Sequence, residues 1–103
     1  MKPEYESLEL VKNNEAHQFE MAVDGATAII EYKESPAVIT LLHTEVPAEL
    51  EGRGIATAII EKTLHWIEKN NIKLIPLCPF VVTYIKRHPE WKRILDASVV
   101  DKY

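Results

Sequence analysis

Hydrophobic and polar residues alternate through much of the first half of the chain, which is the pattern of a half-buried strand. The alternation covers residues 17–23 and residues 26–32, and Asp24-Gly25 lies between the two runs. Asp-Gly favours a two-residue hairpin turn, because both positions of such a turn take positive φ values. The pattern therefore predicts a β-hairpin, and a short apolar run at residues 8–11 predicts one further strand before it.

The next apolar run, at residues 37–46, is rich in β-branched residues and almost continuous. The run follows residues 33–36, and we expect it to be a central strand with both faces covered, since a strand of that kind loses its polar alternation. Together with the strands before it, this run completes a predicted antiparallel meander.

The second half changes to the period of a helix. From Gly54 to Asn70 the apolar residues recur three or four positions apart and share one helical face. That face contains Ala56, Ile60, Leu64 and Ile67, and it is widened by Ile55, Ile59 and Trp66. Residues 72–78 then predict a strand, and residues 79–87 predict a short helix, since Pro79 suits the first turn of a helix.

Pro76 lies inside the predicted strand 72–78. Proline has no N–H to donate within a sheet, so it is normally confined to edges and bulges. If this strand lies beside the strand at residues 37–46, the two strands should separate near Pro76. An extended ligand can enter between strands that separate in this way.

Composition narrows the class of protein. The chain has 103 residues, a formal net charge of −4 and one cysteine. We expect one domain over residues 1–103, and the acidic balance argues against a nucleic-acid partner. One cysteine excludes an internal disulfide, and no spacing of His or Cys indicates a metal site. Without an apolar leader or a long apolar run, the chain is expected to be cytoplasmic and to have no membrane contact.

Two of the three glycines fall within residues 52–56, between the predicted central strand and the long helix. Glycines there let the backbone approach a ligand, and the start of a helix presents unpaired amides that can bind a diphosphate. The alternative is a tight connection that uses glycine for its geometry alone. The spacing fits neither a Walker loop nor the dinucleotide-binding pattern G-x-G-x-x-G.

The segment from Val46 to Ala56 resembles the acetyl-coenzyme A loop of the GNAT acetyltransferase superfamily. That loop typically reads Gln/Arg-x-x-Gly-x-Gly/Ala and follows the fourth strand. The six positions here are Glu51, Gly52, Arg53, Gly54, Ile55 and Ala56. Glu51 departs from the pattern, and a carboxylate near a diphosphate is repulsive unless it points away.

A wider resemblance covers residues 39–91. The segments HTEVP, EGRGIA, IPLCPFV and YIKRHPEW are similar to the small, single-domain YjdJ-type GNAT proteins. The resemblance implies an α/β (α+β) fold with a mixed, mostly antiparallel sheet, a long helix after the fourth strand and a short C-terminal helix. It also implies that the fourth and fifth strands splay to admit coenzyme A, and that the helices shaping an acceptor pocket in larger relatives are absent.

The same resemblance assigns the coenzyme contacts. A backbone N–H within Thr44–Val46 is expected to stabilise the developing oxyanion, with Thr44 and Val46 as the candidates. The amides of Gly52–Ala56, after Glu51, are expected to bind the diphosphate. Arg53 either adds a charge-assisted contact to phosphate or is an exposed loop arginine.

Three side chains are candidates for chemistry. Cys78, beside the start of a predicted helix, is a candidate to carry the acetyl group, and the favoured alternatives are that it lines the coenzyme tunnel or packs as a small hydrophobe. Tyr84 matches the position of a general acid in the superfamily, with a core-facing aromatic residue as the alternative. His43 is a candidate base or a structural histidine, and Glu45 is a weaker candidate for the same task.

We therefore expect an acetyl-CoA-binding N-acetyltransferase that moves an acetyl group to an amine of unknown identity, such as a protein lysine or N-terminus. The alternative is a non-catalytic module that senses CoA or acetyl-CoA, or an interaction domain. The chain is expected to be a monomer or weak dimer with no metal. The basic residues Lys86, Arg87, Lys92 and Arg93 form a solvated helix face, or they meet the coenzyme's 3′-phosphate or an acidic partner.

Overall fold

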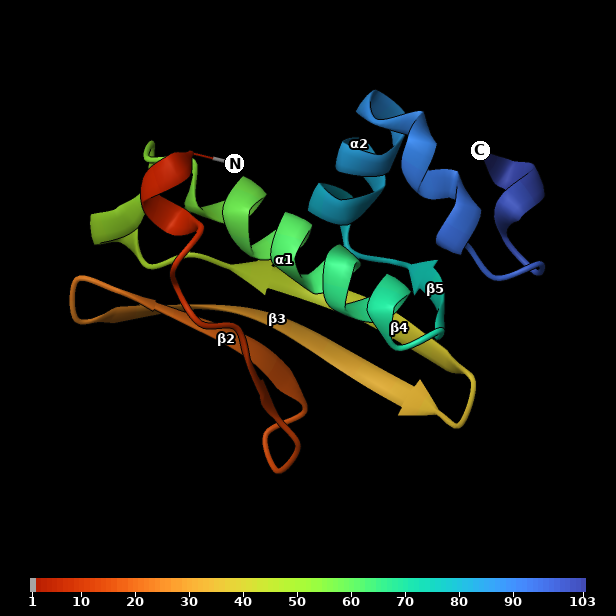
Figure 1. Ribbon diagram of the computed structural model, residues 1–103, viewed down its shortest axis with the longest axis horizontal. Coiled ribbons are helices and arrows are strands. Elements are labelled where there is room, and N and C mark those ends of the chain that lie inside the picture. Colours follow the sequence, from red (N-terminus) through yellow and green to blue (C-terminus); the bar gives the residue numbers. More distant parts are fainter. Residues whose placement is uncertain (1) are drawn as a thin grey trace.

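The computed structural model describes residues 2–103, and its centre is a five-stranded sheet (Figure 1). The strands follow the chain in order: β1 (Val11–Asn13), β2 (Gln18–Val23), β3 (Ala26–Ser35), β4 (Val38–Glu45) and β5 (Lys73–Pro76). The first four strands are antiparallel, and β5 runs parallel to β4. The predicted meander and the mixed, mostly antiparallel sheet are confirmed.

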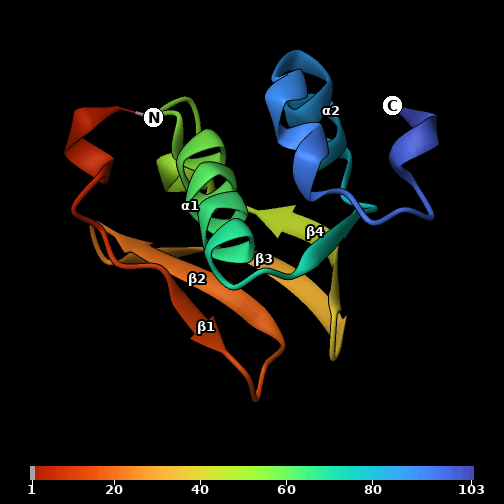
Figure 2. The ribbon, with the colours of Figure 1, turned by 45° about the vertical axis from the view of Figure 1, so that its right-hand side comes forward.

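Two α-helices lie on the same side of this sheet (Figures 1 and 2). They are α1 (Ile55–Lys69), which follows β4, and α2 (Pro79–Arg87), which follows β5. Short 3₁₀ helices occur at Pro3–Tyr5, Ala48–Leu50, Pro89–Ile94 and Val100–Lys102. Both predicted helices are confirmed, and within residues 2–103 no helix is long and apolar enough to cross a membrane.

The core lies between the two helices and the sheet. The predicted face of α1 is largely buried, and the buried residues of this helix are Ile55, Ala58, Ile59, Ile60, Thr63, Leu64 and Ile67. Along β2 and β3 the side chains alternate between buried and more exposed, because only one face of the sheet is covered by helices. Trp66 is half-buried and contacts Phe19 edge-to-face at a ring-centroid distance of 5.3 Å.

The hairpin turn is confirmed, since Asp24 and Gly25 have φ values of 49° and 82°. The alternating run predicts the second strand of the hairpin over residues 26–32, but β3 continues to Ser35 and pairs there with Val38, which leaves a two-residue connection. The first strand is also shorter than expected. Residues 8–10 precede β1, and His17 lies in the β1–β2 turn with a φ of 55° instead of in the strand.

The expectation that residues 37–46 are covered on both faces is wrong for the second half of β4. Ile39, Thr40 and Leu41 are buried, but Leu42, His43 and Glu45 are exposed. The helices cover only one face of the sheet, which leaves residues on the other face exposed (Figure 2). In addition, β5 ends at Pro76, beside Leu41, so the end of β4 extends beyond its neighbour. This uncovered end of β4 is one wall of the candidate site.

Candidate functional site

The strands β4 and β5 separate where the sequence predicts. Their pairing runs from Val38 with Lys73 to Leu41 with Pro76. Beyond this point the carbonyl oxygen of Leu41 accepts hydrogen bonds from the N–H groups of Leu77 and Cys78, at 3.0 and 2.9 Å. The chain then turns away into α2, which opens a gap between the end of β4 and the start of that helix.

A β-bulge lies in β4 at the level of this gap. Tyr32 pairs with Leu41 but Glu31 pairs with His43, so Leu42 is an extra residue in β4. An extra residue reverses the alternation of a strand from that point onward. Thr44 therefore returns to the buried side occupied by Leu41, and only 6% of it is exposed.

Cys78 is buried and bonded at the base of the gap. Its sulfur lies 3.1 Å from the hydroxyl oxygen of Thr44. Cys78 occupies the N-cap position of α2, directly before Pro79, and 1% of it is exposed. The thiol thus bridges β4 and α2.

The glycine turn leads into α1. Gly52 and Gly54 have φ values of 78° and 79°, a conformation that favours glycine, and Gly54 is the N-cap of α1. A Cβ atom at Gly52 would meet no atom within 4 Å, so the backbone conformation, not crowding, requires glycine there. The carbonyl of Gly54 accepts from the N–H of Ala58 at 3.1 Å, and the amides before Ala58 have no acceptor within the helix.

This turn is held from two other parts of the chain. The hydroxyl of the buried Tyr5 donates to the carbonyl of Arg53 at 2.8 Å. The Arg53 guanidinium pairs with Asp24 of the β2–β3 hairpin at 2.9 Å, and the hydrogen bond to Asp24 raises the pKa of Arg53. The Arg53 side chain is therefore directed to the hairpin.

The turn and the end of β4 form a cavity of about 460 Å³, which we call the loop cavity. Its lining contains most of the predicted site residues, namely His43, Thr44, Val46, Glu51, Gly52, Gly54, Ile55 and Ala56. Glu45, Leu50, Thr57 and Phe80 also line it. Three predicted residues, Arg53, Cys78 and Tyr84, lie outside this lining.

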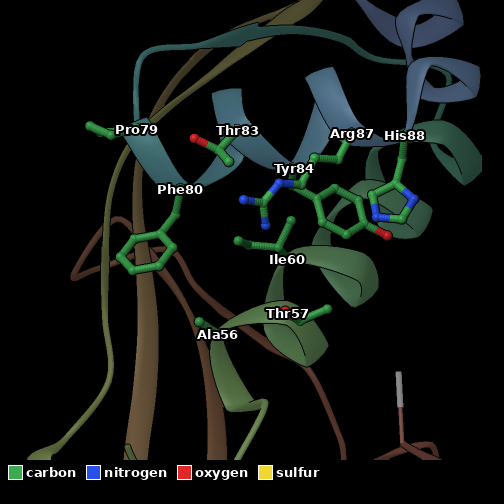
Figure 3. Close-up of a pocket in the computed structure, with 9 residues that line it drawn as sticks. All are labelled: Ala56, Thr57, Ile60, Pro79, Phe80, Thr83, Tyr84, Arg87 and His88. Atoms are coloured by element: carbon green, nitrogen blue, oxygen red, sulfur yellow. The ribbon is translucent and has the colours of Figure 1, made fainter. Parts of the chain in front are cut away.

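A second cavity, of about 500 Å³, lies between α1 and α2 and is called the helix cavity (Figure 3). It shares Ala56, Thr57 and Phe80 with the loop cavity, so the two cavities adjoin each other. The remaining lining is formed by Ile60, Pro79, Thr83, Tyr84, Arg87 and His88.

Tyr84 lies in the helix cavity and not beside His43. Its hydroxyl donates to a carboxylate oxygen of Glu61 on α1 at 2.9 Å. Burial, together with the neighbouring Glu61 carboxylate, raises the pKa of the Tyr84 phenol well above its ordinary value. The ring also packs against His88 at a centroid distance of 4.3 Å.

The loop cavity has carboxylates as well as helix-terminal amides on its walls. Glu45 and Glu51 are exposed and both line it. The Lys2 side chain approaches from the N-terminus, with its Cε 3.6 Å from the position a Cβ atom would take at Gly54. A bound diphosphate would therefore meet amides and one lysine, provided that Glu51 points to solvent.

Sequence reasoning missed the residue that joins the two cavities. Phe80 is 58% exposed although it is a large hydrophobic residue, and it lines both of them. Thr57 also lines both, at an exposed position in the first turn of α1. Their positions on α1 and α2 were predictable, but their role depends on how the helices face each other.

Comparisons with known proteins identify the family of this chain. A family model described as GCN5-related N-acetyl-transferase matches residues 18–94. Protein NATD1 from Gallus gallus is 32% identical over 66 residues, which cover 64% of this chain and 59% of that protein. Protein NATD1 from Mus musculus is 28% identical over 81 residues, which cover 75% of this chain and 73% of that protein.

The fold is shared with a solved structure. The NMR solution structure of a GCN5-like protein from Staphylococcus aureus matches this chain with a TM-score of 0.65 at 23% sequence identity. The match covers 88% of this chain and 90% of that one.

Proposed function

Because the chain belongs to the family of GCN5-related N-acetyl-transferases, we propose that it transfers the acetyl group of acetyl-CoA to an amine, such as a lysine or N-terminal amine of a protein. The observation that carries this proposal is the loop cavity. It joins the end of β4, beyond the point where β4 and β5 separate, to the glycine turn at the start of α1. One extended molecule can therefore contact both.

The glycine turn binds the diphosphate of the coenzyme. Its amides precede the first hydrogen bond of α1, and the N-terminal end of a helix favours negative charge. The positive φ values of Gly52 and Gly54 bring the backbone itself to the cavity wall. Lys2 adds a positive charge at this end, and Arg53 acts by holding the turn to Asp24.

The end of β4 activates the acetyl group, for which acetyl-CoA supplies a thioester carbonyl. Successive residues of a strand direct their backbone N–H and C=O groups toward opposite neighbouring strands. Leu41 directs its carbonyl toward β5. The bulge at Leu42 brings the backbone of Thr44 to that same side, where β5 has already ended. The Thr44 N–H thus donates to the oxygen that becomes negatively charged during acyl transfer.

His43 accepts a proton from the attacking amine. It is exposed, lines the loop cavity and lies next to Thr44, and histidine is the commonest general base. The amine nitrogen bonds to the carbonyl carbon, the carbon–sulfur bond breaks, and coenzyme A leaves as a thiol after taking up a proton. Water supplies that proton, because the Tyr84 hydroxyl lies in the helix cavity and donates to Glu61.

Cys78 is assigned a packing role. Its burial and its contact with Thr44 support this assignment over that of a nucleophile that carries the acetyl group. The thiol keeps the side chain of Thr44 in place, directly beside the backbone group that stabilises the oxyanion.

The alternative function is a non-catalytic module that binds CoA or acetyl-CoA. The observation that favours it is that Glu51 lines the loop cavity at the position where the family loop has a neutral or basic residue. The two functions differ in turnover, since a sensor binds the coenzyme but transfers no acetyl group.

The test combines a transfer assay with calorimetric binding. The wild-type protein should bind acetyl-CoA and release free CoA faster when amines, including a lysine peptide, are added. Gly54→Glu should abolish both acetyl-CoA binding and acetyl transfer, because it places a carboxylate at the glycine turn. Asparagine tolerates the positive φ, so Gly54→Asn should bind acetyl-CoA within about tenfold of the wild-type affinity. Absence of coenzyme binding by the wild type contradicts both functions, and binding without transfer to any amine supports the non-catalytic module.

A further inference from the structure

We propose that Arg87 binds the 3′-phosphate of the coenzyme and makes the protein prefer CoA over dephospho-CoA. This inference rests on the proposed function, because it assumes that the diphosphate lies at the glycine turn. It assigns the helix cavity to the nucleotide end of the coenzyme, and it identifies Arg87 as a residue that determines specificity.

The adjacency of the two cavities gives the direction of the ligand. The thioester end of the coenzyme lies at the end of β4 and the diphosphate lies at the glycine turn. In coenzyme A the ribose and its 3′-phosphate follow the diphosphate. The helix cavity adjoins the loop cavity at Ala56, Thr57 and Phe80, so a ligand that passes these residues brings its nucleotide end into the space beside Arg87.

Arg87 is the arginine available for a ligand. The chain has three arginines, and within residues 2–103 Arg53 pairs with Asp24 and Arg93 pairs with Glu68. No ion pair is present for Arg87 in this part of the chain. Its side chain instead extends from α2 over Ile60 toward Phe80, inside the helix cavity (Figure 3).

The neighbouring basic residues have other positions. Lys92 donates to the main-chain oxygen of Tyr103 at 2.7 Å, and Lys86 is exposed and does not line the helix cavity. Of the four basic residues in this region, Arg87 alone lines the helix cavity. Its planar guanidinium can form two parallel hydrogen bonds to one phosphate.

The lining around Arg87 suits a phosphate monoester on a sugar. Thr57 and Thr83 bring hydroxyl groups to the same cavity, and His88 brings a ring nitrogen. The diphosphate already has the amides of the glycine turn, and Arg87 does not line the loop cavity. The positive charge of Arg87 is therefore available to bind the 3′-phosphate, which is separate from the diphosphate at the glycine turn.

The test measures CoA and dephospho-CoA by calorimetry on the wild type, Arg87→Gln and the matched control Lys86→Gln. A hydrogen bond to a charged group predicts that the wild type binds CoA about tenfold or more tightly than dephospho-CoA. Arg87→Gln should reduce this preference to about twofold or less and leave the affinity for dephospho-CoA nearly unchanged. Lys86→Gln should keep the wild-type preference.

The results separate this inference from the proposed function. If the wild type binds both ligands equally, or if Arg87→Gln keeps the preference for CoA, the role of Arg87 is overturned while coenzyme binding stands. If the wild type binds neither ligand, both are overturned. The affinity of Arg87→Gln for dephospho-CoA also serves as the folding control, because an unchanged value requires a correctly folded binding site.

Discussion

The hydroxyl oxygen of Thr44 lies 3.1 Å from the sulfur of Cys78, and this contact joins β4 to the start of α2 just beyond the point where β4 and β5 separate. Both residues are buried. Thr44 faces Cys78 because the bulge at Leu42 turns it inward. This buried contact therefore fixes the start of α2 against β4, next to the proposed oxyanion site.

Cys78→Ala should lower the free energy of unfolding by about 1–2 kcal/mol, because it removes a buried group and its contact with Thr44. Urea unfolding measures this change. If Cys78 only packs, the turnover of the variant should fall less than about threefold. Intact-mass analysis of the wild type after exposure to acetyl-CoA should show no acetyl group on Cys78, and stable acetylation there would contradict the packing role.

Tyr5→Phe should weaken acetyl-CoA binding although Tyr5 does not line the loop cavity. The variant loses the hydrogen bond from its hydroxyl to the carbonyl of Arg53, so the glycine turn is held only by the Arg53–Asp24 pair. We expect a threefold to tenfold loss of affinity, about 1 kcal/mol, which is the usual contribution of one hydrogen bond. Calorimetry measures it.

Tyr103→Phe is the matched control for this variant, since Tyr103 is the C-terminal residue and that end of the chain lies on the far side of α2 from α1 (Figures 1 and 2). It should leave the affinity unchanged. Equal affinities for Tyr5→Phe and the wild type would show that Tyr5 supports the fold but not the turn.

His43→Gln should lower turnover by about 10²-fold or more while the affinity for acetyl-CoA stays within about threefold, because a general base acts on the amine and not on the coenzyme. A transfer assay and calorimetry measure the two quantities. His17→Asn is the control, since His17 is exposed in the β1–β2 turn and asparagine tolerates its positive φ of 55°. A fully active His43→Gln variant would remove His43 from the mechanism.

Tyr84 should make the stability of the protein depend on pH in the alkaline range. Burial and the Glu61 carboxylate raise its pKa in the folded state above the ordinary value near 10 that applies after unfolding. The contribution is fully present below about pH 10 and is lost as the pH rises from there toward the folded pKa, because only the unfolded state then loses the proton readily.

Urea unfolding at several values from about pH 8 to pH 11 tests this dependence. The wild type should lose more stability over this range than Tyr84→Phe, which has no phenol to ionise. If the two proteins show parallel curves, the Tyr84 hydroxyl is not held by burial and Glu61 as the structure indicates.

Local sequence signals predicted the elements that frame the site. Asp24-Gly25 predicted the two-residue hairpin turn between β2 and β3, because few residue pairs accept two positive φ values. The helical period between Gly54 and Asn70 predicted α1 to within one residue at each end. Pro76 predicted the separation of β4 and β5, because a proline has no N–H and cannot donate a sheet hydrogen bond at its own position.

The features missed by sequence reasoning depend on residues far apart in the chain. The bulge at Leu42 is defined by its register against β3, and no local pattern marks it. Tyr5 and Arg53 are 48 positions apart, and Tyr84 and Glu61 are 23 apart. The orientation of Arg53 toward Asp24 follows from the hairpin's place beside the glycine turn, which only the folded chain establishes.

The most direct test of the central claim is an amide ¹H–¹⁵N NMR titration of the protein with acetyl-CoA. Binding in the loop cavity predicts saturable shifts that are largest for the amides of Thr44, Gly52, Gly54 and Ala56, all of which line it. Shifts confined to another region, such as the cavity of about 300 Å³ beside Asn71 and Arg93, would contradict the account. So would the absence of any shift at millimolar acetyl-CoA.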